Sequence, residues 1–144
     1  MAELFDIIGK AALRISTQYT HSLTSTYSTL QFDQKTVERG GLTSNLTTDS
    51  ILIDTTGAYE IVICIDADYA NNQEMLMMIH VNGVAYSALA SSQQGRGTGK
   101  PMNFSWTSTT NLTAGDIVDV RIASEATSYD AEIRRLMYSI KRDH

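Results

Sequence analysis

TGAYEIVICID, residues 56–66, is the stretch from which the fold can be inferred. Thr56-Gly57 marks a turn, and the residues after it alternate between two faces. One face carries Tyr59, Ile61, Ile63 and Ile65, and the other carries Glu60, Val62, Cys64 and Asp66. Both faces are apolar near the middle of the stretch, which is typical of a strand covered on both sides. The sequence therefore predicts a central β-strand here.

Strand patterns continue on both sides of this stretch. Asn82-Gly83, between Ile79-His80-Val81 and Val84-Ala85-Tyr86, is a strong hairpin signal because both turn positions tolerate positive φ. Residues 28–32, 50–54, 75–81, 102–106, 118–122 and 131–141 also favour strands. About eight short strands at a spacing near ten residues indicate an antiparallel sandwich or barrel. The predicted fold class is all-β.

Composition supports one domain and excludes several kinds of protein. The chain has 144 residues, of which 17 are Thr and 14 are Ser, and Thr favours strands. A net charge of −5 disfavours binding to nucleic acid through phosphate neutralisation. The single cysteine excludes a disulfide framework within the chain. No apolar run approaches the ~20 residues that span a bilayer, so no membrane contact is expected. No secretion signal is expected either, because the first residues are acidic.

The first residues differ from the rest. Apolar residues at 4, 7, 8, 11, 12 and 15 have the spacing of one helix face, which predicts an amphipathic arm over 1–17 before a β-sandwich domain over 18–144. An amphipathic face must be buried, either on its own domain or on another chain. If the arm docks on a partner, the contacting residues are Leu4, Phe5, Ile7, Ile8, Ala11 and Ile15.

Three motifs, in order, resemble C1q/TNF-like jelly rolls. They are Thr56-Gly57-Ala58-Tyr59-Glu60-Ile61, Val81-Asn82-Gly83 and Leu112-Thr113-Ala114-Gly115-Asp116-Ile117-Val118. The resemblance covers roughly residues 28–141. The final strand lacks the aromatic and glycine-rich pattern of the animal proteins, and the chain is closer to the small jelly rolls of tailed-bacteriophage structural proteins. The resemblance implies an antiparallel jelly-roll β-sandwich that forms a homotrimer and works by binding and assembly.

Residues that could carry chemistry are few. His21, His80 and His144 lack metal-ligand spacing, and Cys64 has no basic neighbour in the sequence to activate it, so His80 and Cys64 are interpreted as structural. Gly95 to Lys100 does not match a phosphate loop, because Pro101 stands where Ser or Thr should hold magnesium. This segment is interpreted as part of a mobile polar loop from Ser91 to Lys100, in which Arg96 and Lys100 could contact an acidic partner. We expect no metal, no cofactor and no enzymatic activity.

These observations favour a viral structural protein. The first hypothesis is a trimeric capsid cement or decoration protein, made in the host cytoplasm and located on the virion surface. It would bind the major capsid protein through the arm and the jelly roll. Because residue 1 is a methionine, no fibre shaft is expected before the domain. The alternative is a receptor-binding domain of a phage tail fibre or spike, whose recognition loops would include Asn71-Asn72 and Gln93 to Lys100. A third class, a sugar-modifying enzyme, would need several histidines on strands.

Overall fold

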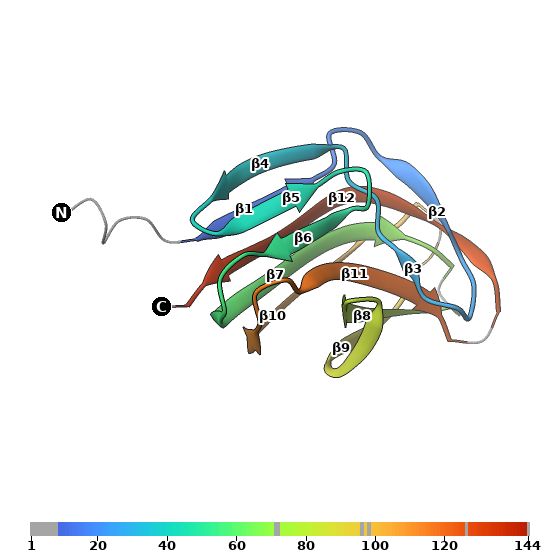
Figure 1. Cartoon of the computed structure of the whole chain (residues 1–144). Helices are drawn as coiled ribbons and strands as arrows, with labels where there is room; N and C mark the ends of the chain where they lie inside the picture. Colours follow the sequence, from blue (N-terminus) through green and yellow to red (C-terminus); the bar gives the residue numbers. More distant parts are fainter. Residues whose placement is uncertain (1–8, 71–72, 96, 98, 126, 144) are drawn as a thin grey trace.

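In the computed structural model the described residues form two antiparallel sheets packed face to face (Figure 1). The structure describes residues 9–70, 73–95, 97, 99–125 and 127–143. The first sheet has the order β10 (Met102–Leu112), β7 (Gly57–Asp68), β12 (Tyr129–Arg142), β1 (Lys10–Arg14) and β4 (Gln34–Arg39), with β2 (Tyr19–Leu23) also paired to β12. The second has the order β5 (Leu42–Asn45), β6 (Ser50–Ile53), β11 (Ile117–Ser124), β8 (Glu74–Val81) and β9 (Val84–Gln94), with β3 (Ser28–Thr29) paired to β11. The all-β prediction is confirmed.

The core lies between the two sheets. Tyr59, Ile61, Ile63 and Ile65 of β7 are fully buried, and β7 lies between β10 and β12, as its sequence predicted. The hydroxyl of the fully buried Tyr138 on β12 donates to the carbonyl oxygen of Val118 on β11 at 3.0 Å, which ties one sheet to the other. Each buried Ile or Leu side chain contributes about 1.5–3 kcal/mol in transfer terms, so this layer supplies most of the stability.

The predicted hairpin is confirmed. Asn82 and Gly83 have φ of 54° and 78° and join β8 to β9, as a two-residue turn with positive φ at both positions requires. The second strand of the hairpin is longer than expected. Glu74 pairs with Gln94, so residues 91–94 continue β9 and the prediction of a loop beginning at residue 91 is wrong. Their polar composition suits an edge strand as well as it suits a loop.

The predicted helix is wrong over residues 10–14, which form strand β1. Ala11 pairs with Ile140 of β12 and with Glu38 of β4, so β1 lies inside the first sheet. Ala11 and Leu13 are fully buried in the core, and Ala12, on the opposite face, is only 4% exposed. A short strand that is buried on both faces has no polar alternation, and its apolar residues then also fit a helical spacing. Residues 10–14 therefore belong to the sandwich and not to a separate arm.

Candidate interaction surface

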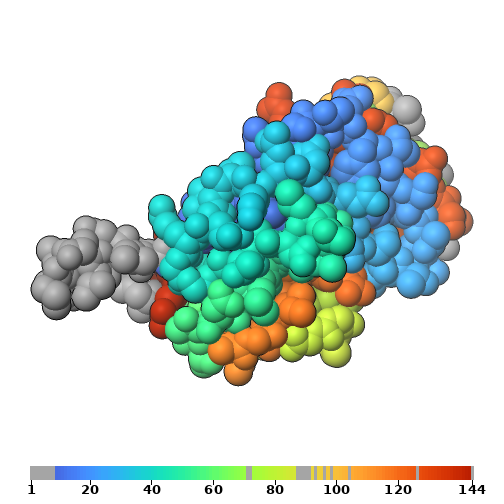
Figure 2. Space-filling view, turned by 45° about the horizontal axis from the view of Figure 1, so that its top comes forward, coloured from blue at the N-terminus to red at the C-terminus, as the bar shows by residue number. Residues whose placement is uncertain are grey.

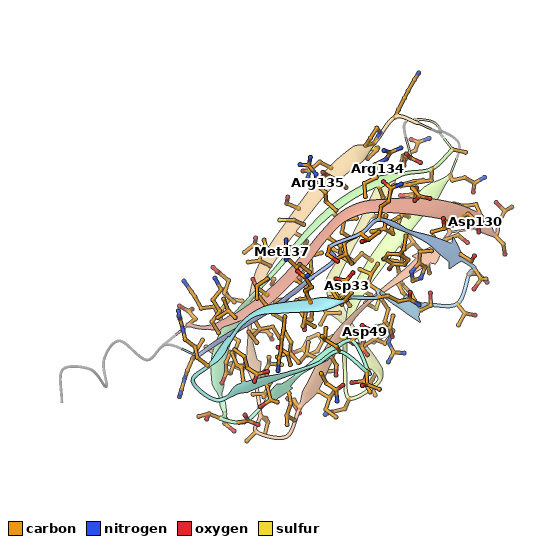
Figure 3. The ribbon with its side chains drawn as sticks, turned by 90° about the horizontal axis from the view of Figure 1, so that it is seen from above. Asp33, Asp49, Asp130, Arg134, Arg135 and Met137 are labelled. Carbon is orange, nitrogen blue, oxygen red and sulfur yellow. The ribbon has the colours of Figure 1, made fainter. Side chains whose placement is uncertain are left out.

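The outer face of the first sheet carries an uncharged central area. Cross-strand pairing aligns Ala12 with Ser139 and Val62, and aligns Met137 with Cys64 in the next row. Ala12 and Ser139 are nearly covered, whereas Val62 and Cys64 are half-buried and Met137 is 43% exposed. We call these five residues the outer patch. Figure 3 shows Met137 along β12, in line with Arg135 and Arg134.

Cations border the outer patch. Arg39, Lys10 and Lys141 face one another directly across β4, β1 and β12, in a single row. Arg14 and Arg135 lie on the same outer face toward the other end of the patch. Like charges directly opposite in a sheet are destabilising. The same rows also carry carboxylates, since Glu60 of β7 pairs with Lys141 and Asp66 of β7 pairs with Arg135. The named cations are therefore concentrated on the β4–β1–β12 part of this face, and the carboxylates on β7.

The two edge strands on one side of the sandwich, β9 and β10, carry no charge. Their 22 residues, 11 in each, include no Asp, Glu, Lys, Arg or Pro. Edge strand β4, on the opposite side, has Lys35, Glu38 and Arg39 among its six residues. Charges and prolines on edge strands prevent association with other chains. The β4 edge is therefore protected against association with other chains, whereas the β9–β10 edge lacks this protection.

A shallow pocket of about 370 Å³ opens at the border of the outer patch. Arg14, Asn103 and Arg135 line it together with Cys64 and Met137. Cys64, interpreted from the sequence as structural, is half-buried, and the Ser105 hydroxyl lies 3.7 Å from its sulfur. The alternation along β7 placed Cys64 on the face opposite to Ile63 and Ile65, and that face is the outer one.

A second polar site lies where β2 and β3 approach each other across the open end of the sandwich. His21 is only 6% exposed, and both of its ring nitrogens have partners. Its Nδ1 lies 3.0 Å from the Tyr19 hydroxyl, and its Nε2 lies 2.8 Å from the Ser28 hydroxyl. These three side chains border a pocket of about 340 Å³. Sequence reasoning did not find this site, because Ser28 reaches His21 across a turn. The signal available in the sequence was that Tyr19 and His21, two residues apart, share one face if this segment is a strand.

The residues predicted to bind a partner do not form one site. Leu4, Phe5, Ile7, Ile8 and Arg96 lie outside the described residues. Ala11 is buried in the core of its own sandwich, which rules out its predicted contact with a partner, and Ile15 is partly buried against the same core. Lys100 is exposed, and its backbone N–H donates to the carbonyl oxygen of Gly97 at 3.0 Å.

His80 is 5% exposed on the outer side of β8. Its ring lies 5.6 Å from the Tyr27 ring, and it faces Asp119 directly across β11. Asp119 accepts two hydrogen bonds from Arg121, at 2.9 and 3.1 Å. Burial lowers the pKa of His80, and the nearby Arg121 cation lowers it further. Burial also lowers the pKa of His21.

These two histidines make stability depend on pH. Because their pKa values in the folded chain lie below the ordinary 6.5, the unfolded chain binds protons more readily, and the free energy of unfolding falls as the pH drops below that value. We expect the urea midpoint to decrease from about pH 7.5 to about pH 5.5. The H21Q/H80Q variant should show a smaller decrease. An equal decrease in the variant would assign the effect to other groups.

Among the described residues, no group of three or more His, Cys, Asp or Glu side chains could hold a metal ion. In that same part of the chain no helix has the length and apolar character that a membrane span requires.

The fold is that of TNF-like jelly rolls. The structure of Eiger TNF from S. frugiperda superposes with a TM-score of 0.71 at 14% identity, over 96% of this chain and 94% of that one. Murine APRIL superposes with a TM-score of 0.66 at 13% identity, over 94% of this chain and 98% of that one. No protein-family model and no curated protein matches the sequence. The likeness confirms the predicted sandwich architecture.

Proposed function

We propose that this chain is a binding and assembly module that associates into a homotrimer and acts by adhesion rather than catalysis. The observation that carries the proposal is the outer patch, where Met137 is 43% exposed in the middle of a sheet whose other face is the core. An exposed apolar area at such a place is typical of a protein–protein contact. The TNF-like fold supports this assignment, since the resemblance seen in the sequence implies a trimer.

The charges favour one arrangement of the copies. If two outer patches met face to face about a two-fold axis, three cations of each copy, Arg39, Lys10 and Lys141, would be brought against the other copy's face, and the same row holds one carboxylate, Glu60, to offset them. The edge formed by β9 and β10 has no charge and could cover an outer patch without that repulsion. A contact between an edge and a face joins different surfaces, and such contacts close into rings when the rotation permits. We therefore propose that the β9–β10 edge of one copy covers the outer patch of the next, in a ring of three.

Met137→Lys tests the homotrimer. The wild-type protein should have three times the 15.9 kDa mass of the chain by light scattering, and the variant should have the mass of one chain, because an ammonium group buried on the outer patch would face Arg14 across the sheet. Ile117→Lys is the matched control, since Ile117 is 46% exposed but lies on the second sheet. The control should remain trimeric.

Other masses would contradict the proposal. A wild-type mass of one chain would show that the protein does not self-assemble. A mass of two chains would indicate a face-to-face dimer instead of a ring of three. Circular dichroism should be the same for wild type and both variants, because both substituted side chains are exposed at the surface of the sandwich.

As the specific role we propose capsid cement on the virion surface, which the resemblance to phage structural jelly rolls supports. Deleting residues 1–8 tests the remaining part of the arm, Leu4, Phe5, Ile7 and Ile8, and leaves β1 intact. The truncated protein should stay folded and trimeric but lose binding to purified capsid shells. Unchanged binding would show that residues 1–8 do not contribute to capsid binding. Electron microscopy separates this role from a receptor-binding domain of a tail fibre: many copies over the shell support cement, whereas few copies at the tail support the alternative.

A further inference from the structure

We propose that the cations at one end of the outer face of the first sheet bind an acidic segment of a partner protein. Arg39, Lys10 and Lys141 belong to β4, β1 and β12, and strand pairing places them directly opposite one another. We call these three residues the cation row. Lys10 is partly exposed, and Arg39 and Lys141 are exposed, so the row is open at the surface of the chain. The proposal rests on the binding function proposed above and names the chemistry of the partner.

The cation row opposes folding when no ligand is bound. Like charges directly opposite in a sheet are destabilising, and Lys10 has one on each side. Directly opposite Cβ atoms lie about 5 Å apart, which is less than the screening length of about 8 Å at physiological salt. Glu60 of β7, opposite Lys141, offsets one charge, so the four side chains keep a net charge of +2 in a chain whose net charge is −5. An acidic ligand would relieve the remaining repulsion.

The two lysines of the row can accept a new carboxylate without losing an old one. Among the described residues, no ion pair joins Lys10 or Lys141 to an Asp or Glu side chain. Arg121 and Arg134, by contrast, are held by carboxylates of their own sheets at 2.9 and 2.5 Å. A partner's carboxylate would have to break those ion pairs, whereas at the lysines it meets an unpaired ammonium group.

The cation row lies beside the segment proposed to bind the capsid. Residues 1–8 join the sandwich at Gly9, whose carbonyl oxygen accepts a hydrogen bond from the backbone N–H of Arg142 at 2.7 Å. Figure 2 shows the last described residues of β12, in red, below the cyan residues of β4 at this end of the molecule. A protein surface that receives the arm therefore also approaches the row. Rotational symmetry would bring the three rows of a ring to the same end, so that individually weak contacts combine.

The length of the cation row suits an extended acidic peptide. Neighbouring strands lie about 4.8 Å apart, so the row runs for about 10 Å across three strands. In an extended peptide, side chains two residues apart stand about 7 Å apart on the same face. Two or three glutamates in alternate positions can therefore reach all three cations at once. A peptide with this spacing is the ligand that we expect.

Amide NMR on the full-length protein with a synthetic Glu-Gly-Glu-Gly-Glu peptide tests the proposal. At low salt the peptide should bind with a dissociation constant on the order of 1 mM and shift the amide signals of Lys10 and Lys141. The variant Lys10→Gln/Lys141→Gln should raise that constant about tenfold, because two surface ion pairs with the peptide are lost. Lys35→Gln is the matched control, since Lys35 is also exposed on this sheet but is already paired with Glu38 at 3.5 Å. The control should bind the peptide as the wild type does.

Stability provides a second readout. Without peptide and at low salt, Lys10→Gln should raise the urea midpoint by about 0.3 M, because it removes the central charge of the row. The gain should shrink as salt is added, since salt screens the repulsion between exposed charges. Lys35→Gln should give no such gain, because it removes an attractive pair. A midpoint for Lys10→Gln equal to or below that of the wild type would contradict the repulsion on which the proposal depends.

Three binding results would overturn the proposal. The first is no binding of the peptide, or equal binding by the double lysine variant. The second is tighter binding of inorganic triphosphate than of the peptide, which would indicate a phosphate site. The third is binding only after residues 1–8 are deleted, which would show that Glu3 and Asp6 of the same chain occupy the row. A wild-type protein that has the mass of one chain but binds the peptide would contradict the homotrimer and support the cation row.

Discussion

Replacing Arg134 with methionine is expected to lower the free energy of unfolding by about 3 kcal/mol. The Arg134 guanidinium meets the Asp68 carboxylate through Nε at 2.7 Å and through a second nitrogen at 2.5 Å. The side chain of Asp68 is only 7% exposed, so water cannot replace the lost partner. Methionine keeps much of the apolar stem and removes the charge, which leaves a buried carboxylate without compensation. Urea unfolding at neutral pH measures the change.

The neighbouring Arg135 provides the control. Its Nε lies 3.7 Å from Asp66, and its side chain is 86% exposed, so the ion pair is loose and screened by solvent. Arg135→Met should change stability by less than about 0.5 kcal/mol. Adding Asp68→Asn to Arg134→Met should recover part of the loss, because the buried charge is then removed. Equal losses in Arg134→Met and Arg135→Met would contradict the assignment of Asp68 as a buried, paired carboxylate.

Truncating Ile63 to alanine is expected to cost about 3–4 kcal/mol, through lost transfer free energy and the cavity left behind. Ile63 is fully buried at the middle of β7, directly between Trp106 of β10 and Tyr138 of β12. Both neighbours are rigid aromatic side chains on paired strands, so the site cannot collapse easily. The midpoint of thermal unfolding should fall, at the same protein concentration as the wild type, because an assembly makes the midpoint depend on concentration.

Ile117→Ala makes the same chemical change at an exposed position. Ile117 is 46% exposed at the start of β11, so its truncation should cost less than about 1 kcal/mol. A similar loss at both positions would contradict the assignment of β7 as the centre of the core.

The sequence predicted those parts of the fold in which local pattern and burial agree. β7 has a clear inner face, and Asn82-Gly83 has the backbone conformation that its residue types favour. β1 was mistaken for a helix because Ala12 is covered on the outer face as well, which removes the polar alternation of a strand.

The candidate sites were harder to predict, because they depend on pairing between distant segments. The outer patch combines β1, β7 and β12, and only the register brings Ala12, Ser139 and Val62 into one row. The resemblance to jelly rolls predicted two packed sheets but not which face would remain open. Likewise, the His21 pocket depends on the turn that returns Ser28 to β2.

The position of β12 has a consequence for biosynthesis. β12 lies between β7 and β1 in the first sheet, and Lys10 pairs with Lys141, so a strand that is translated after both of its neighbours fills a central place. While the ribosome is still making it, β1 and β7 lack their shared neighbour, and the sheet cannot close. Pairing between β1 and β12 is slow, because the two strands are far apart along the chain. The nascent polypeptide therefore passes through a stage with two unpaired edges in the middle of its future core, when it is most prone to aggregation.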